Sequence, residues 1–103
     1  NEPFILFNLA SNRFEMQQYQ EALQYIQASL KVSRPQDSIV RKLFAMAAQC
    51  QIKLGHTSAA LNILQQGQSI YPVDAEMLFT EGALRIENRD YEGAITTYKK
   101  LLD

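Results

Sequence analysis

Apolar residues group into amphipathic stretches along the chain, at the three- and four-residue spacing that forms one face of an α-helix. Pro35 and Pro72 each close such a stretch, and Gly55 separates two more between them. No useful length of the chain alternates apolar and polar residues, as a half-buried strand would. We therefore expect six helices, at about residues 3–16, 19–32, 38–54, 57–69, 74–88 and 90–102.

Residues that favour helix ends stand at several of these boundaries. Gly55 has the position of a helix C-terminal cap. Thr57, Asp74 and Asp90 can each accept a hydrogen bond from a free N–H group at the start of the following helix. The last helix is expected to run to the end of the chain.

The helices repeat in pairs. A shift of 34 residues places Ala48 on Gly82 and Ala60 on Ala94, and a shift of 38 places Ala10 on Ala48. Small side chains at these places let two antiparallel helices approach closely, while large residues nearby fill the space around each crossing. The repeat predicts three helix pairs stacked on one another.

The repeat divides the chain into three units of one all-α domain, at about residues 3–36, 37–72 and 73–103. The first unit is longer by four residues, which fall near residues 31–38. This place lies between two helix pairs, where an insertion costs little stability.

The order of small, alanine, large and proline positions within a 34-residue unit resembles the tetratricopeptide repeat over nearly the whole chain. The third unit matches best, through Gly82, Ala94, Tyr98 and the preceding Pro72. The first unit departs most, because the insertion moves its proline to Pro35. The resemblance implies an α-solenoid, a right-handed superhelical stack of antiparallel helix pairs, that binds proteins and has no catalytic role.

Several strings also resemble the repeat region of bacterial, notably cyanobacterial, family 2 glycosyltransferases. They include residues 4–9 (Phe-Ile-Leu-Phe-Asn-Leu), residues 37–43 (Asp-Ser-Ile-Val-Arg-Lys-Leu), Tyr71-Pro72 and Glu81-Gly82. The resemblance implies a nucleotide-sugar-dependent transferase domain outside this chain, which itself has no Asp-x-Asp metal motif. The chain lacks a starting methionine and stops in a predicted helix, so we expect it to be part of a longer protein.

Two roles remain open for the repeats in such a protein. They either dock a neighbouring domain or a separate protein, or hold the acceptor polypeptide or glycan for the transferase. In the second role, aromatic side chains such as Phe7, Tyr71 and Phe79 would stack on sugars.

Composition narrows the kind of partner. The chain has 103 residues, 47% of them hydrophobic, and a net charge of −1 from 10 basic and 11 acidic residues. This balance disfavours nucleic-acid binding, including a small RNA-binding repeat, and a polybasic membrane surface. No apolar run reaches the roughly 18–20 residues of a membrane span. We expect protein or peptide partners, or a neighbouring domain of the same chain, and a cytoplasmic location compatible with the single cysteine.

No residue pattern indicates catalysis, a metal or a cofactor. His56 stands in a predicted turn with no carboxylate or nucleophile indicated nearby, so we interpret it as a turn residue. Cys50 has no partner at ligand spacing, which predicts a small buried hydrophobe and no zinc site. The scattered glycines exclude a phosphate-binding loop. The carboxylates of the third unit, Glu81 among them, are interpreted as solvated helix faces and N-terminal caps.

The resemblance also implies where a ligand binds, because the first helix of each tetratricopeptide pair lines the inner, concave surface. The corresponding residues are Phe7, Asn8 and Ser11 in the first unit, Ala45, Met46 and Gln49 in the second, and Phe79, Thr80 and Ala83 in the third. Lys42 and Lys53 flank the second set, and Glu76 and Glu87 flank the third.

These positions predict the character of the ligand. Chaperone-binding members of the family hold a terminal carboxylate with basic and asparagine side chains, but Phe7, Ser11 and Met46 stand at three of those places. We therefore expect no binding of chaperone C-termini. Phe7, Met46 and Phe79 predict an apolar stripe that either binds an apolar peptide or an amphipathic helix, or packs between adjacent helices.

The last unit is followed by no polar terminal helix. Tyr98, Leu101 and Leu102 are therefore expected to be exposed as an apolar end of the stack. We expect this end to pair with another copy of the chain or with a continuation of the stack.

Overall fold

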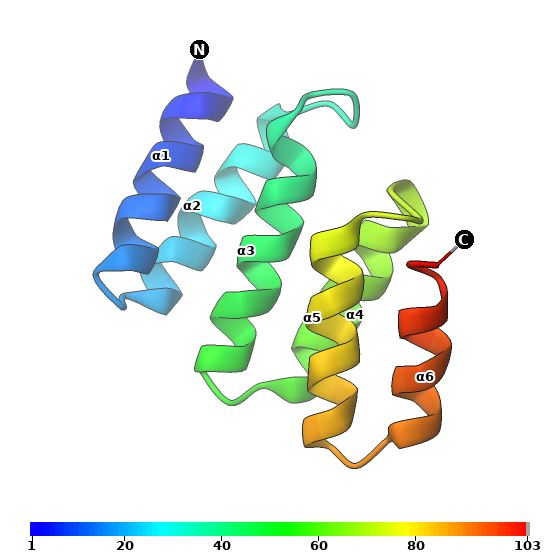
Figure 1. Cartoon of the computed structure of the whole chain (residues 1–103). Helices are drawn as coiled ribbons and strands as arrows, with labels where there is room; N and C mark the ends of the chain where they lie inside the picture. Colours follow the sequence, from blue (N-terminus) through cyan, green and yellow to red (C-terminus); the bar gives the residue numbers. More distant parts are fainter. Residues whose placement is uncertain (103) are drawn as a thin grey trace.

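The computed structural model describes residues 1–102, and these form an all-α fold without strands. The helices are α1 (Glu2–Glu15), α2 (Tyr19–Val32), α3 (Ile39–Lys53), α4 (Thr57–Ile70), α5 (Ala75–Glu87) and α6 (Tyr91–Lys99) (Figure 1). All six correspond to helices expected from the sequence. The all-α fold class is therefore confirmed over the described residues.

The helices form three antiparallel pairs, α1 with α2, α3 with α4 and α5 with α6 (Figure 1). Each second helix also packs on the first helix of the next pair, so that α2 contacts α3 and α4 contacts α5. The first helices meet one another in a row, since α3 contacts both α1 and α5. The predicted stack of three helix pairs is confirmed, and its first helices form one continuous face.

Alanines at the predicted crossing positions bring the helices of a pair together. Ala10, Ala22, Ala48 and Ala60 are completely buried. Gly82 lies beneath the ring of Tyr98, so close that an added Cβ would collide with the ring. The small positions of the repeat thus mark the places where neighbouring helices leave no room for a side chain.

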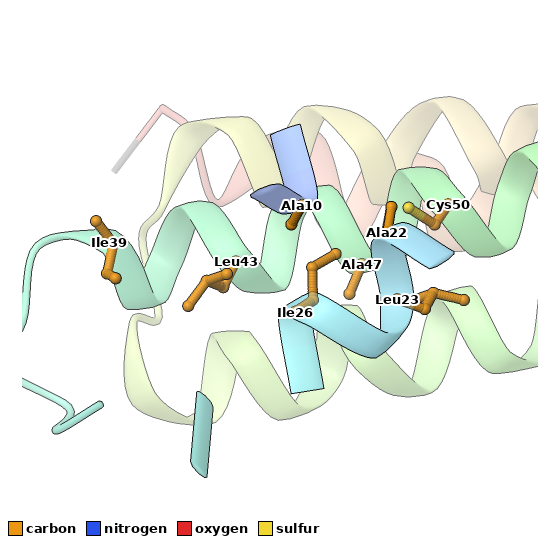
Figure 2. Packing of buried hydrophobic residues seen from close by; sticks show 8 residues of the cluster. All are labelled: Ala10, Ala22, Leu23, Ile26, Ile39, Leu43, Ala47 and Cys50. Atoms are coloured by element: carbon orange, nitrogen blue, oxygen red, sulfur yellow. The ribbon is translucent and has the colours of Figure 1, made fainter. Parts of the chain in front are cut away.

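Two clusters of buried side chains form the core, and α3 contributes to both. The first lies among α1, α2 and α3 and consists of Ala10, Ala22, Leu23, Ile26, Ile39, Leu43, Ala47 and Cys50 (Figure 2). The second joins α3, α4 and α5 and consists of Ala45, Ala48, Ala60, Leu64, Met77 and Leu84. The helix α3 therefore packs against the first pair with one of its faces and against the third pair with another.

Cys50 belongs to the first cluster and is fully buried, as its helical position predicted. Burial raises the pKa of the Cys50 thiol to about 11. The thiol therefore stays protonated at neutral pH and packs as a small apolar group.

A buried ion-pair network fixes the third pair. Glu81 of α5 is only 4% exposed and accepts hydrogen bonds from Gln68 of α4 (2.6 Å), Arg85 (2.7 Å) and Thr97 of α6 (3.1 Å). Arg85 donates a further bond of 2.7 Å to Asp90. The interpretation of Glu81 as a solvated carboxylate was wrong, because this side chain connects three helices away from water.

The four-residue insertion of the first unit is anchored by the loop after α4. The Tyr71 hydroxyl donates a hydrogen bond to the backbone carbonyl of Pro35. The Arg41 guanidinium lies 4.6 Å from the centroid of the Tyr71 ring and 3.8 Å from an Asp74 carboxylate oxygen. Tyr71 thus joins the inserted loop, through Pro35, to the segment between α4 and α5, and Arg41 joins α3 to the same segment.

The three turns within the pairs share one backbone geometry. Gln17, Gly55 and Arg89 occupy equivalent places and all have positive φ, of 63°, 81° and 63°. The backbone N–H group of the residue after each of them donates a hydrogen bond to the carbonyl oxygen five residues earlier, as from His56 to Gln51 and from Asp90 to Arg85. This pattern is a Schellman cap, and it confirms the predicted role of Gly55.

The N-terminal caps agree with the sequence at two sites and differ at a third. Asp74 and Asp90 accept hydrogen bonds of 3.0 Å from the backbone N–H groups of Met77 and Gly93, as predicted. Thr57 does not cap α4, because the shared turn places His56 at the cap position and Thr57 inside the helix. The His56 side chain makes no capping hydrogen bond.

The last helix is shorter than expected and ends at Lys99. The N–H groups of Lys100, Leu101 and Leu102 bond to carbonyls three residues back rather than four. The prediction that this helix runs to the chain end was wrong over residues 100–102, where this tighter turn replaces the α-helical spacing, and Asp103 lies outside the described residues.

We expect His56→Asp to raise the free energy of unfolding by about 1 kcal/mol. The backbone at His56 (φ −100°, ψ 73°) resembles that at Asp90 (φ −91°, ψ 71°), whose carboxylate caps α6. An aspartate at position 56 would reach the N–H group of Ala59 in the same way. Urea denaturation measures the gain, and His56→Ala serves as the control that cannot cap. Equal stability of the two variants would contradict the prediction.

Candidate functional site

A hollow of about 440 Å³ opens on the face formed by the first helices. Its lining comes from α1, α3 and α5 and consists of Ser11, Phe14, Glu15, Lys42, Ala45, Met46, Gln49 and Glu76. The row of contacts from α1 through α3 to α5 creates this hollow, because it sets three helices side by side. We call it the first hollow.

A second hollow of about 280 Å³ lies on the same face, between α3 and α5. Its lining consists of Gln49, Ile52, Phe79, Thr80, Ala83, Leu84 and Glu87. Gln49 belongs to both hollows, and its amide nitrogen lies 3.4 Å from the Thr80 hydroxyl. The two hollows therefore adjoin across one polar side chain, and together we call them the groove.

Eight of the predicted binding residues line the groove. They are Ser11, Lys42, Ala45, Met46, Gln49, Phe79, Thr80 and Ala83. Three others, Phe7, Asn8 and Lys53, line neither hollow. Phe7 is half-buried against the first core cluster, which is the packing role left open for it, whereas Asn8 and Lys53 are exposed. Eight of the eleven residues thus lie together on one face, and ligand binding by any of them stays a prediction.

The apolar part of the groove differs from the predicted stripe. Phe14 lines the first hollow together with Met46, although it was not among the predicted binding residues. Phe7 lies outside this hollow. Ile52 and Leu84 were also missed and line the second hollow with Phe79. Phe14 and Ile52 occupy equivalent places of the repeat, one helical turn beyond the selected positions, so the same alignment contains the signal for both.

Among residues 1–102, the charged side chains of the groove form no ion pairs. Glu15, Lys42 and Glu76 line the first hollow, and Glu87 lines the second. The four ion pairs of residues 1–102 lie elsewhere and use Arg34, Arg41 and Arg85 with other carboxylates. The charges at the groove are therefore available to a ligand.

His56 lies away from the groove in the turn before α4, as predicted. Its Nδ1 atom is 2.9 Å from the side-chain oxygen of Gln51, and the residue is exposed. Within residues 1–102, no three His, Cys, Asp or Glu side chains come together as a metal site would require. None of the described helices combines the length and the apolar character needed to cross a membrane.

The far end of the stack carries a third, largely apolar hollow of about 430 Å³. It is lined by Phe79, Ile95, Tyr98, Lys99, Leu101 and Leu102. Leu102 is 87% exposed, as expected, but Tyr98 and Leu101 are half-buried. Tyr98 and Leu101 are therefore less exposed than expected. The Tyr98 ring covers Gly82 and lies 6.1 Å from the Phe79 ring.

Residues 5–36 match the sequence profile of the tetratricopeptide repeat family. The match covers most of α1 and all of α2, the pair whose sequence departs most from the repeat pattern. No curated protein matches the chain. The match and the stacked helix pairs together support a tetratricopeptide repeat domain.

Proposed function

We propose that this chain is a protein-binding scaffold whose partner lies in the groove formed by α1, α3 and α5. The single observation that carries the proposal is the pair of adjoining hollows on one face, built from eight of the positions expected to bind a ligand. The first hollow alone has a volume within the roughly 300–1,000 Å³ of known ligand pockets.

The lining favours a peptide segment as the ligand. Apolar walls from Phe14 and Met46 in the first hollow and from Phe79 in the second suit apolar side chains. Gln49 between them offers an amide group that can pair with a peptide backbone. The groove thus suits an extended peptide or one face of an amphipathic helix, from another protein or from a neighbouring domain.

Met46→Ala should weaken the binding of a groove peptide about fivefold or more, corresponding to about 1 kcal/mol, because it removes an apolar wall. The peptide is one selected by the wild-type chain from a library of random dodecapeptides, and the dissociation constant is measured by fluorescence anisotropy. Met16→Ala is the matched control, since Met16 is 54% exposed and lines neither hollow. Equal weakening by both variants, or by neither, would argue against the groove.

The apolar end of the stack favours a second contact, between copies of this chain. Ile95 is 49% exposed in that hollow, beside the 87% exposed Leu102. Light scattering should show an average mass that rises with concentration for the wild-type chain but not for Ile95→Glu. Thr96→Glu, an exposed change on the same helix outside the hollow, should behave like wild type. A monomeric wild-type chain at high concentration would rule out this contact.

The resemblance to family 2 glycosyltransferases supports a more specific setting, in which the scaffold is an accessory region of such an enzyme. Of the aromatic residues suggested to stack on sugars, Phe79 is 58% exposed, whereas Arg41 covers the Tyr71 ring and Phe7 is half-buried. The test is to delete residues 1–103 from a transferase that contains them. Lost turnover on small acceptors would indicate a substrate-holding role, and retained turnover with lost selection of protein acceptors would indicate docking.

A further inference from the structure

The groove has an excess of negative charge that the chain as a whole does not have. Its lining contains three carboxylates, Glu15, Glu76 and Glu87, and one ammonium group, Lys42. The whole chain is nearly neutral, with 10 basic and 11 acidic residues. The acidic character is therefore concentrated where the proposed ligand binds.

These carboxylates are not engaged in holding the fold. The carboxylates with structural roles are Asp37, Asp74, Glu81 and Asp90, each within ion-pair distance of an arginine. No ion pair within residues 1–102 involves Glu15, Glu76 or Glu87, and all three side chains are exposed. Bringing a cation to them would add an interaction without breaking one.

Each carboxylate borders an apolar wall of the groove. Glu15 and Glu76 line the same hollow as Phe14 and Met46, and Glu87 lines the hollow of Phe79. An apolar side chain that packs against these walls excludes water beside the carboxylates. The local dielectric constant then falls, which strengthens the attraction of the carboxylates to a cation. Lys42 offsets only one of the negative charges.

We infer that the groove selects a protein segment in which an apolar side chain is flanked by lysine or arginine residues. This inference rests on the proposed function and adds the chemistry of the partner to it. The apolar side chain would occupy the hollow of Met46 or that of Phe79, and the flanking cations would pair with Glu15, Glu76 or Glu87. The charge sets specificity and the association rate, and the apolar contact supplies affinity.

The test is a selection of random dodecapeptides on the immobilised chain, followed by sequencing of the enriched peptides. Lysine and arginine should be enriched beside an apolar residue. The double variant Glu76→Lys and Glu87→Lys should instead enrich aspartate and glutamate. A peptide selected by the wild-type chain should bind this variant at least about tenfold more weakly, and raising the salt from about 50 to about 300 mM should weaken its binding to the wild-type chain.

The matched control is the double variant Glu21→Lys and Glu92→Lys. It makes the same change in net charge, on the second helices α2 and α6 and outside the groove. Like Glu76, both residues lie in the first turn of their helices, where a lysine opposes the helix dipole. Glu87 ends α5, where a lysine suits the dipole, so the control should cost at least as much stability as the groove variant. This control should keep the preference of the wild-type chain for basic peptides.

The outcomes distinguish a failure of the charge preference from a failure of the proposed peptide-binding function. Enriched peptides without basic residues would overturn the charge preference and leave the peptide-binding groove standing. An equal reversal of preference by the control variant would also overturn the inference, because net charge alone would explain it. No enrichment of any peptide would overturn both.

Discussion

Replacing Glu81 with alanine is expected to lower the free energy of unfolding by about 3 kcal/mol. The change removes the acceptor that receives hydrogen bonds from Gln68, Arg85 and Thr97 on three different helices. Arg85 keeps its 2.7 Å bond to Asp90, which holds the cost near the lower end for a broken buried ion pair. Urea denaturation followed by circular dichroism measures the loss.

Lowering the pH should remove the stabilisation that Glu81 gives to the wild-type chain. Burial alone would raise the pKa of Glu81, but hydrogen bonds from Arg85, Gln68 and Thr97 outweigh burial and hold the pKa below the ordinary value of 4.5. Because the folded pKa is depressed, the stabilisation is present above pH 4.5 and is lost as the pH falls through the folded pKa. Glu81→Gln, which keeps the shape of the side chain, should lack this part of the pH dependence. Parallel stability–pH curves for the two proteins would contradict the role of Glu81.

Leu64→Ala is expected to cost about 3 kcal/mol, because it leaves a cavity in the second core cluster. Leu64 is fully buried where α4 faces α3 and α5, so the cavity weakens the attachment of the third pair to the second. Thermal denaturation with tyrosine fluorescence gives the change in stability.

The control for the cavity is Leu102→Ala, which removes the same atoms from a side chain that is 87% exposed. This variant should stay within about 0.5 kcal/mol of wild type. Similar losses for the two variants would show that the second cluster does not hold the pairs together.

The sequence predicted the helices and their pairing because its signals were local and repeated. Alanines at matching places in successive helices indicate where helices cross, and Gly55, Pro35 and Pro72 indicate where helices end. The sequence misplaced the cap at Thr57, because the shared turn starts the helix one residue earlier than capping preference suggests. It missed the end of α6 because Lys100, Leu101 and Leu102 carry no signal that stops a helix.

The groove could be predicted only in part, for a related reason. Positions in the middle of the first helices, such as Met46 and Gln49, line it because helix geometry places them on one face. Glu81 was misinterpreted because burial of a carboxylate depends on Gln68 and Thr97, which lie on other helices and are distant in sequence. Phe7 and Phe14 are both apolar residues of α1 that pack against the first core cluster, but only Phe14 also lines the first hollow, a difference that the apolar pattern alone does not indicate.

The contacts of the stack have a mechanical consequence. Within residues 1–102, α1 and α2 pack on α3 but on neither α5 nor α6, so the first and third pairs are joined mainly through the second pair. We therefore expect the stack to bend at the contacts between neighbouring pairs, with each pair rotating slightly on the next while every hairpin stays intact. The first hollow takes lining from both α1 and α5, so this bending changes its width. We therefore expect the spacing between Glu15 and Glu76 to adjust when a segment enters the first hollow.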